Sequence, residues 1–339
     1  MKLPALRRYA LCFGTAALLA ACGGSQPPIG APGAMPQSQT SVVAAHAQRD
    51  GSWMLPEATS QDLLYVSGGN EVDVYAYPSG EQVGSLTNFH GTGYECADSA
   101  GDVFITTGSG SPSGVYEYAH GGSQPISFLS VPYSAAGCSV DPLSGNLAVV
   151  GIDSDSVYVF VGAQGSPVAY RDPDLRAWDV AYDDSGNLFA HGSYGNDQLA
   201  LVELPKGGSE FQDITIESKL DTAYGAMLWD GKYIDIATET AAGPRRSVVN
   251  RLKVANGKAT TIGKVWLARQ ETGYWPEFWI DSDMIIEPST IGRIQKVFSW
   301  KYPGGKEMAK ISDPNNYRLW GVTLSSMPSH ARVQRKTLQ

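Results

Sequence analysis

Short apolar runs alternate with polar residues along most of the chain, and many of them end in a glycine-containing turn. The run VDVYAYPSG (residues 72–80) is one example. Alternation over five or more residues predicts a β-strand with one buried face, and the glycine supplies the positive φ of a tight hairpin turn. The turn glycines of six such hairpins lie 42 to 49 residues apart, at Gly80, Gly122, Gly165, Gly208, Gly257 and Gly305.

A second element lies upstream of the hairpin in five of these copies. It consists of an apolar strand, an acidic or glycine turn and another apolar strand, as in GCSVDPLSGNLAVV (137–150) and WDVAYDDSGNLFA (178–190). Each unit therefore contains four short strands in roughly 45 residues, which is the period of a propeller blade. No helical pattern separates the strands, which argues against βαβ units.

The two ends of the repeat region complement each other. The first unit, Leu63 to Phe89, has three strands and lacks the leading one, whereas residues 317–326 (YRLWGVTLSS) form a lone strand of the leading type. Pairing these two would close a ring and leave no open sheet edge. We expect an all-β, six-bladed β-propeller over residues 61–327, with four-stranded antiparallel blades and a C-terminal strand that joins the first blade.

The turns DPLSGNL and DDSGNL and the opening LLYVSGGNEVDVYAYPSG resemble the NHL-repeat and YncE-like group of bacterial β-propellers. The phrases LYVS, GCSVDP and GNLAV more narrowly resemble uncharacterised propeller lipoproteins of bacteria. The resemblance covers about residues 61–326. It implies the fold but no particular activity, because propellers serve as binding modules, scaffolds and enzymes alike.

The N-terminus has the pattern of a lipoprotein signal peptide. Positive residues at Lys2, Arg7 and Arg8 precede a short apolar run, and Leu19-Ala20-Ala21-Cys22 resembles a bacterial lipobox. We expect cleavage after residue 21 and lipidation of Cys22; an ordinary secretory signal cleaved near Ala21 is the alternative. Acyl chains would then tether the protein to a membrane without a spanning helix.

The segments on either side of the propeller are expected to be unstructured. Residues 22–60 are rich in Pro, Gly, Ser and Gln, which is typical of a flexible linker, and residues 328–339 form a basic tail. By resemblance to lipoprotein sorting in Gram-negative bacteria, Gly23 after the cysteine favours the outer membrane. We expect a lipid-anchored protein of the bacterial cell envelope that faces the periplasm or the cell exterior.

Charge narrows the range of partners and cofactors. A net charge of −9 argues against a nucleic-acid surface, which needs clustered Lys and Arg.

An aspartate recurs once per unit in turns that have only two or three oxygen side chains: Asp141, Asp183, Asp230 and Asp281. We assign them to turn structure. No metal site or cofactor is predicted, and a structural or central divalent cation is the less favoured alternative.

Cys96 and Cys138 lie in the leading strands of adjacent units, nearly one period apart. An oxidising compartment favours a disulfide between them. Two buried free thiols that act as small hydrophobic residues are the alternative, and the sequence alignment leaves both open.

Residues just before each leading strand should surround one mouth of the central channel. Aromatic and charged groups on converging loops can form a ligand site, although each could instead fill space between blades. The residues of this predicted mouth are Tyr94, Glu95, Trp178, Asp179, Tyr224, Tyr274, Trp275, Glu277, Arg318 and Trp320.

The sequence therefore favours a membrane-anchored, extracytoplasmic propeller that acts as a binding or scaffold module rather than an enzyme. Its ligand would be a protein, a small molecule or a carbohydrate. The alternative is a metal-dependent hydrolase that resembles the six-bladed lactonases and uses Glu95, Asp179 and Glu277. No metal-spaced pair of histidines and no G-x-S-x-G motif supports catalysis.

Overall fold

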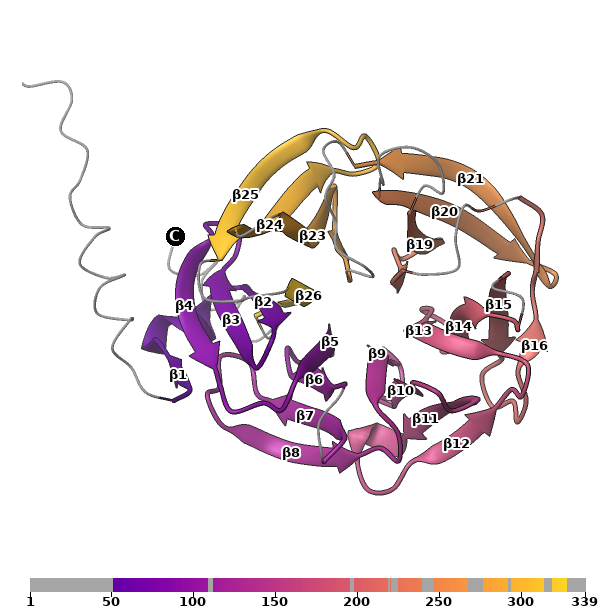
Figure 1. The fold of residues 1–339 in the computed structure, drawn as a ribbon, viewed down its shortest axis with the longest axis horizontal. Coiled ribbons are helices and arrows are strands. Elements are labelled where there is room, and N and C mark those ends of the chain that lie inside the picture. Colours follow the sequence, from indigo (N-terminus) through magenta and orange to yellow (C-terminus); the bar gives the residue numbers. More distant parts are fainter. Residues whose placement is uncertain are drawn as a thin grey trace, which may run out of the picture. The chain divides into compact units, whose positions relative to one another are not determined.

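A computed structural model of the chain describes residues 51–108, 112–195, 198–218, 220, 225–239, 247–267, 277–291, 294–313 and 319–327. Its strands form six sheets that surround a central axis as the blades of a propeller (Figure 1). The described residues contain two short 3-10 turns, η1 (Pro56–Ser60) and η2 (Val161–Ala163), and no α-helix. No helix in this part of the chain is long and apolar enough to cross a membrane. The predicted six-bladed, all-β fold is confirmed.

Blades 1 to 3 use the N-terminal half of the propeller and the last strand of the chain. Blade 1 contains β26, β2, β3 and β4, with β1 added at its outer edge; blades 2 and 3 contain β5–β8 and β9–β12. Their bounds are β1 Trp53–Met54, β2 Leu63–Gly68, β3 Glu71–Ala76, β4 Glu81–Leu86, β26 Leu319–Ser325, β5 Thr92–Ala97, β6 Val103–Thr107, β7 Gly114–Tyr118, β8 Pro125–Ser130, β9 Ala135–Val140, β10 Leu147–Gly151, β11 Ser156–Phe160 and β12 Val168–Arg171.

Blades 4 to 6 follow in chain order. Blade 4 contains β13–β16, blade 5 contains β18–β21 with the short β17 parallel to its outer strand, and blade 6 contains β22–β25. Their bounds are β13 Arg176–Tyr182, β14 Leu188–Ser193, β15 Leu199–Leu204, β16 Gln212–Asp213, β17 Thr215–Ile216, β18 Met227–Trp229, β19 Ile234–Glu239, β20 Ser247–Ala255, β21 Lys258–Trp266, β22 Trp279–Asp281, β23 Met284–Ile291, β24 Ile294–Lys301 and β25 Glu307–Asp313.

The ring closes between the two ends of the propeller. Strand β26 pairs antiparallel with β2, from Leu63 opposite Ser325 to Gly68 opposite Leu319. The last strand therefore supplies the inner strand that blade 1 lacks, as expected from residues 317–326. Every blade now has an inner strand at the channel and an outer strand at the rim (Figure 1).

The propeller begins earlier than the expected boundary at residue 61. Strand β1 pairs with β4, with Trp53 opposite Ser85, and the buried Ala58 lies in the following 3-10 turn. Residues 53–60 are thus the outer edge of blade 1 and not part of the linker, because their backbone and side chains pack on the blade.

The hydrophobic core lies between the blades in six separate layers. In the layer between blades 1 and 2, for example, Tyr65 and Val74 pack with Ile105 and Tyr118. A strand within a blade contributes alternate residues to the layers on its two sides, so β2, the second strand of blade 1, is buried at all six positions. The expectation of one buried face is therefore wrong for such strands, and it holds best for outer strands such as β21.

Turn residues also link neighbouring blades. The tyrosines of the two Tyr-Pro sequences, at cis peptide bonds 77–78 and 302–303, reach the first turn of the preceding blade. Tyr77 donates to Asp281 at 3.0 Å, and Tyr302 donates to Asp230 at 2.7 Å. In two of the predicted hairpin turns the positive φ belongs to the first glycine of a Gly-Gly pair, Gly121 and Gly207, not to Gly122 and Gly208.

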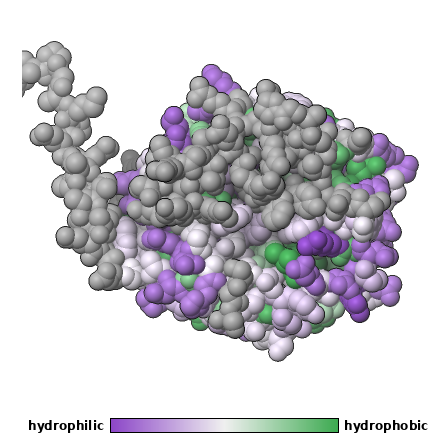
Figure 2. All heavy atoms as spheres, in the orientation of Figure 1, coloured by the Kyte–Doolittle hydropathy of each residue, from purple (hydrophilic) through white to green (hydrophobic). Residues whose placement is uncertain are grey.

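One face of the ring is displayed in Figure 2. Its coloured part carries mostly hydrophilic and intermediate residues, with hydrophobic ones in small separate groups. This mixture is ordinary for a protein surface exposed to water.

Candidate functional site at the central channel

The inner strands bring three of the predicted acids to the channel. Glu95 lies in β5, Asp179 lies in β13, and Glu277 lies two residues before β22. All three are buried, with 1%, 3% and 6% of their surface exposed. Of the other predicted mouth residues, Tyr94 and Trp178 lie within the same strands and Trp320 lies within β26. Among the predicted mouth residues that the structure describes, only Glu277 precedes its strand as expected.

The remaining predicted site residues cannot be placed. Tyr224, Tyr274, Trp275, Arg318 and the lipidation candidate Cys22 lie outside the described residues.

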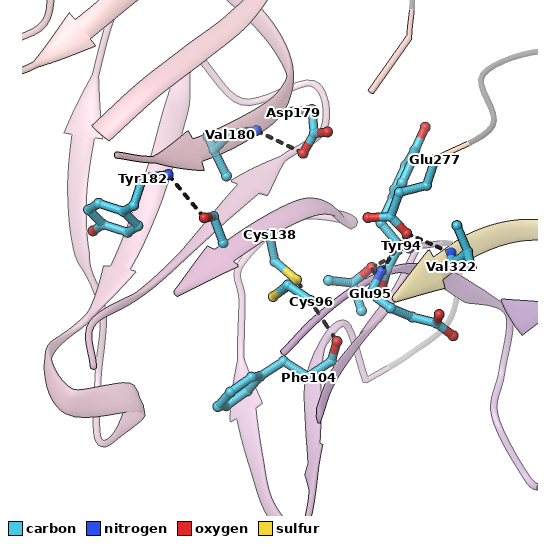
Figure 3. The surroundings of a disulfide bond; sticks show 12 residues. Tyr94, Glu95, Cys96, Phe104, Cys138, Asp179, Val180, Tyr182, Glu277 and Val322 are labelled. Atoms are coloured by element: carbon cyan, nitrogen blue, oxygen red, sulfur yellow. Dashed lines mark hydrogen bonds between the residues drawn. A yellow bond between two sulfur atoms is a disulfide. The ribbon is translucent and has the colours of Figure 1, made fainter. Parts of the chain in front are cut away.

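Asp179 holds blades 4 and 5 together at the channel. Its Oδ1 accepts the amide of Val180 at 2.8 Å (Figure 3). Its Oδ2 accepts the amide of Met227 in β18 at 2.7 Å. The carboxylate also packs against blade 3, where a Cβ at Gly137 would overlap it. Burial raises the pKa of Asp179 to about 7, while the two amides oppose that rise.

Glu277 performs the same task at the closure of the ring. Its Oε2 accepts the amide of Glu95 in blade 2 and the amide of Val322 in β26, each at 3.0 Å (Figure 3). The side chain lies close to Gly321, which leaves room for it. Burial raises the pKa of Glu277 well above its ordinary value, and the charges of Asp179 and Glu95 add to the rise.

These hydrogen bonds provide acceptors for backbone amides of the inner strands. An inner strand pairs with a neighbour on one side only, so amides on its other edge face the channel without a ladder partner. Buried amides need an acceptor, and Asp179 and Glu277 accept two each. The two carboxylates therefore cap strand edges of adjacent blades.

Glu95 differs from the other two acids. Neither of its carboxyl oxygens has a hydrogen-bond partner among the described residues. The nearby Ser67 hydroxyl donates to Gly93 O at 2.7 Å, so its one proton is committed elsewhere. Burial raises the pKa of Glu95 to about 8. Burial therefore favours the neutral, protonated form of Glu95.

The aromatic residues of this region pack beside the acids. Tyr94 is half-buried, and its pKa is raised by burial and by the charges of Asp179 and Glu277. The Arg176 guanidinium lies over the Trp178 ring at 4.8 Å, and the Trp320 carbonyl accepts the amide of Glu277 at 2.9 Å. Trp320 therefore contacts Glu277 through its backbone.

His191 is a buried residue that sequence reasoning did not connect with the channel. It lies opposite Asp179 in β14 and has no exposed surface. Its Nε2–H donates to the carbonyl of Gly225 at 2.7 Å, and Nδ1 has no partner in the described part of the chain. Burial lowers the pKa of His191 to about 4, so the ring is neutral at pH 7. A lone histidine within an apolar repeat offers no sequence signal for this contact.

Cys96 and Cys138 form a disulfide between the inner strands of blades 2 and 3, with a Cα–Cα distance of 5.8 Å (Figure 3). Both cysteines are buried. The bond lies in the wall of the channel, beside the backbone of Glu95.

A cavity of about 170 Å³ occupies the channel between the inner strands. Besides Glu95, Glu277 and the disulfide, its lining includes Tyr182 and Trp229 at the ends of β13 and β18, Asp184 in the turn after β13, and Trp279 at the start of β22. Sequence reasoning missed these four. The signal for Tyr182 and Trp229 is an aromatic residue at the end of the leading strand, followed by an acidic turn, as in AYDD and LWDG.

The acidic turns themselves bind their own backbone. Asp141 Oδ1 accepts the amide of Leu143 at 2.9 Å, and Asp183 Oδ1 accepts the amides of Ser185 and Asn187 at 2.9 Å each. For Asp141 and Asp183, as for Asp230, this is the local turn role assigned from the sequence. Within the described residues, no three His, Cys, Asp or Glu side chains are placed to hold a metal ion.

No protein-family model matches the chain, and no curated protein matches it. Among solved structures, a chain in the crystal structure of a nidogen/laminin complex aligns with a TM-score of 0.60 and 15% identity, over 78% of this chain and 99% of that one. TolB from Acinetobacter baumannii aligns with a TM-score of 0.56 and 12% identity, over 80% of this chain and 68% of TolB. At such identities the likeness shows the fold alone, which is that of a β-propeller.

Proposed function

We propose that this protein is a membrane-anchored, extracytoplasmic β-propeller that acts as a binding or scaffold module. The observation that carries the proposal is that the channel carboxylates hydrogen-bond to the protein's own backbone. Asp179 and Glu277 accept backbone amides from neighbouring blades, so they serve the ring and not a substrate. A ring held in this way is a rigid frame, and we expect a ligand or partner to bind in its cavities and grooves.

The anchoring part of the proposal rests on the N-terminal sequence. The lipobox-like Leu19-Ala20-Ala21-Cys22 would give a lipidated cysteine, and the segment after it would act as a tether. We place the protein in the bacterial cell envelope, with Gly23 favouring the outer membrane. A disulfide between Cys96 and Cys138 suits such an oxidising compartment.

The charge of the molecule bears on its partners. A net charge of −9 repels nucleic acid and favours neutral or cationic partners.

Replacing Cys22 with Ser tests the anchor. The variant should move from the membrane fraction to the soluble fraction after cell lysis, and labelling with a radioactive fatty acid should be lost. Cys12→Ser is the matched control, because Cys12 lies in the signal segment and should leave fractionation unchanged. Retention of the Cys22→Ser variant in the membrane fraction would contradict the proposed anchor.

The alternative function is a metal-dependent hydrolase that uses Glu95, Asp179 and Glu277. The observation in its favour is that burial raises the pKa of all three acids, as it does for many catalytic groups. However, Asp179 and Glu277 already accept four backbone hydrogen bonds, which occupy both oxygens of Asp179 and Oε2 of Glu277. The binding role therefore fits the geometry better.

A further inference from the structure

A groove lies between blades 1 and 2 at the rim of the propeller, away from the channel. Figure 1 shows these two blades as neighbours, with β1 at the outer edge of blade 1 and β8 at the outer edge of blade 2. The groove has a volume of about 450 Å³. Its lining residues are Gly51, Ser52, Thr87, Asn88, Phe89, Tyr116, Tyr118, Ser123, Gln124 and Pro125.

Aromatic rings form one side of the groove. Phe89 and Tyr118 are buried, each with 4% of its surface exposed, and Tyr116 is half-buried. The Tyr116 ring meets Phe89 edge-on at 5.5 Å and packs against Phe128 at 4.7 Å. These contacts hold Tyr116 in place, so it can serve as a fixed apolar surface.

Hydroxyl and amide side chains form the rest of the lining. Ser52 Oγ accepts the amide of Thr87 at 2.9 Å, and Asn88 Nδ2 donates to Thr87 Oγ1 at 3.2 Å. The bond to Ser52 fixes the N-terminal segment against the residue that follows β4. Gln124, in the turn before β8, is exposed. Each hydroxyl or amide group of the lining can both donate and accept hydrogen bonds.

The lining carries no formal charge, although the protein as a whole has a net charge of −9. Burial raises the pKa of Tyr118 to about 12, so its hydroxyl stays neutral. A groove between blades 3 and 4 offers the contrast, since its lining includes Arg171, Asp172, Asp174, Glu210 and Asp213. A charged ligand would find no counter-charge in the uncharged groove.

We infer that the groove between blades 1 and 2 binds a neutral saccharide. A pyranose ring presents an apolar C–H face, which suits the Tyr116 ring, and hydroxyls that both donate and accept, which suit the amides and hydroxyls. A proline-rich peptide would also suit the aromatic side, but its backbone offers mainly acceptors. The inference specifies the ligand class of the proposed binding role and rests on it.

The test measures saccharide binding to the purified full chain by isothermal titration calorimetry and saturation-transfer NMR. The probes are maltose, cellobiose, lactose and di-N-acetylchitobiose, with glucuronic acid as a charged saccharide and a PPII-forming proline-rich peptide. We expect saturable binding of at least one neutral disaccharide and no binding of glucuronic acid at the groove. Tyr116→Ala should weaken binding at least tenfold, and Gln124→Ala should weaken it severalfold.

Tyr133→Ala is the matched control. Tyr133 is 47% exposed and lies outside the groove, and its contact to Ser113 uses the backbone carbonyl, which alanine keeps. This variant should bind within twofold of the unaltered protein. Circular dichroism and thermal melting of each variant separate lost binding from lost folding, and Gln124→Ala, at an exposed turn position, gives a second variant that should fold normally.

Three results would overturn the inference: no neutral disaccharide binds, Tyr116→Ala binds as tightly as the unaltered protein while folded, or only the proline-rich peptide occupies the groove. None of them bears on membrane anchoring, which the Cys22→Ser fractionation measures separately. Failure of the saccharide site is thus distinguishable from failure of the anchor.

Discussion

The buried acids of the channel follow from the hydrogen-bonding needs of the inner strands. The sequence predicted Glu95, Asp179 and Glu277 together at one mouth of the channel, because all three were expected just before a repeated leading strand. It did not predict that Asp179 and Glu277 would accept amides of other blades. That result depends on strand register and on close approach at Gly137 and Gly321, which the spacing of residues does not show.

Glu95→Gln should change the pH dependence of stability. The pKa of Glu95 rises from an ordinary 4.5 to about 8 on folding, so its proton stabilises the fold fully below pH 4.5 and loses that effect as pH rises through 8. Glutamine cannot ionise. We expect the free energy of unfolding in urea to be the same for the variant and the unaltered protein at pH 4. At pH 9 the variant should be more stable by roughly 1–4 kcal/mol.

Glu81→Gln makes the same charge change at an exposed position and serves as the control. It should shift stability by less than about 0.5 kcal/mol at both pH values. A parallel pH profile for Glu95→Gln and the unaltered protein would show that Glu95 is ionised in the folded state.

Asp179→Ala should destabilise the ring by about 2–4 kcal/mol, because it leaves the buried amides of Val180 and Met227 without their acceptor. Asp179→Asn, which keeps one oxygen acceptor, should cost less. Chemical denaturation measures both, with Asp184→Ala as an exposed control on the same blade. Equal stability of the alanine variant and the unaltered protein would rule out the capping role.

At the scale of elements, the repeat pattern located the strands well and their edges less well. Two strands joined by an acidic turn and a glycine hairpin recur in the structure at the expected positions, as in β9 to β12. The short β1 was missed, because two residues added to a blade edge carry no periodic signal. The burial of both faces of β2 and β10 was also missed, since it arises from the adjacent blades.

The disulfide is an inter-element bond whose energetic effect can be measured. Cys96 and Cys138 close a loop across 42 positions between β5 and β9. Restricting the unfolded chain in this way should contribute about 2–4 kcal/mol. We expect the Cys96→Ala/Cys138→Ala double variant to unfold at a correspondingly lower urea concentration. A reductant should lower the urea midpoint of the unaltered protein and leave the double variant unchanged. Identical midpoints for both proteins without reductant would contradict the expectation.

At the scale of the whole molecule, the number of blades and the closure of the ring were readable from the sequence. The sequence contains six hairpin copies, its first unit lacks a strand, and its last strand belongs to no unit. A closed six-bladed ring, in which the last strand completes the first unit, accounts for all three features. The sites were less readable, because they form where side chains of different blades meet. The groove between blades 1 and 2, for instance, combines Phe89 from one unit with Tyr116 from the next.

Removal of the closing strand tests the ring. Deletion of residues 319–339 removes β26 and the buried Leu319 and Val322, and it leaves the channel-facing edge of β2 unpaired. We expect loss of cooperative unfolding and aggregation, measured by circular dichroism and light scattering. Deletion of residues 328–339 alone is the control and should leave the melting temperature within about 1 °C. A cooperative fold without β26 would contradict the closure.

The central claim is that the channel carboxylates hold blades together and do not serve a metal-dependent reaction. Elemental analysis of the purified protein, without added metal or chelator, tests this claim most directly. Since Asp179 and Glu277 accept backbone amides, we predict far less than one divalent metal ion per chain. One tightly held divalent ion per chain, lost in the Glu277→Gln variant, would contradict the account and favour the hydrolase alternative.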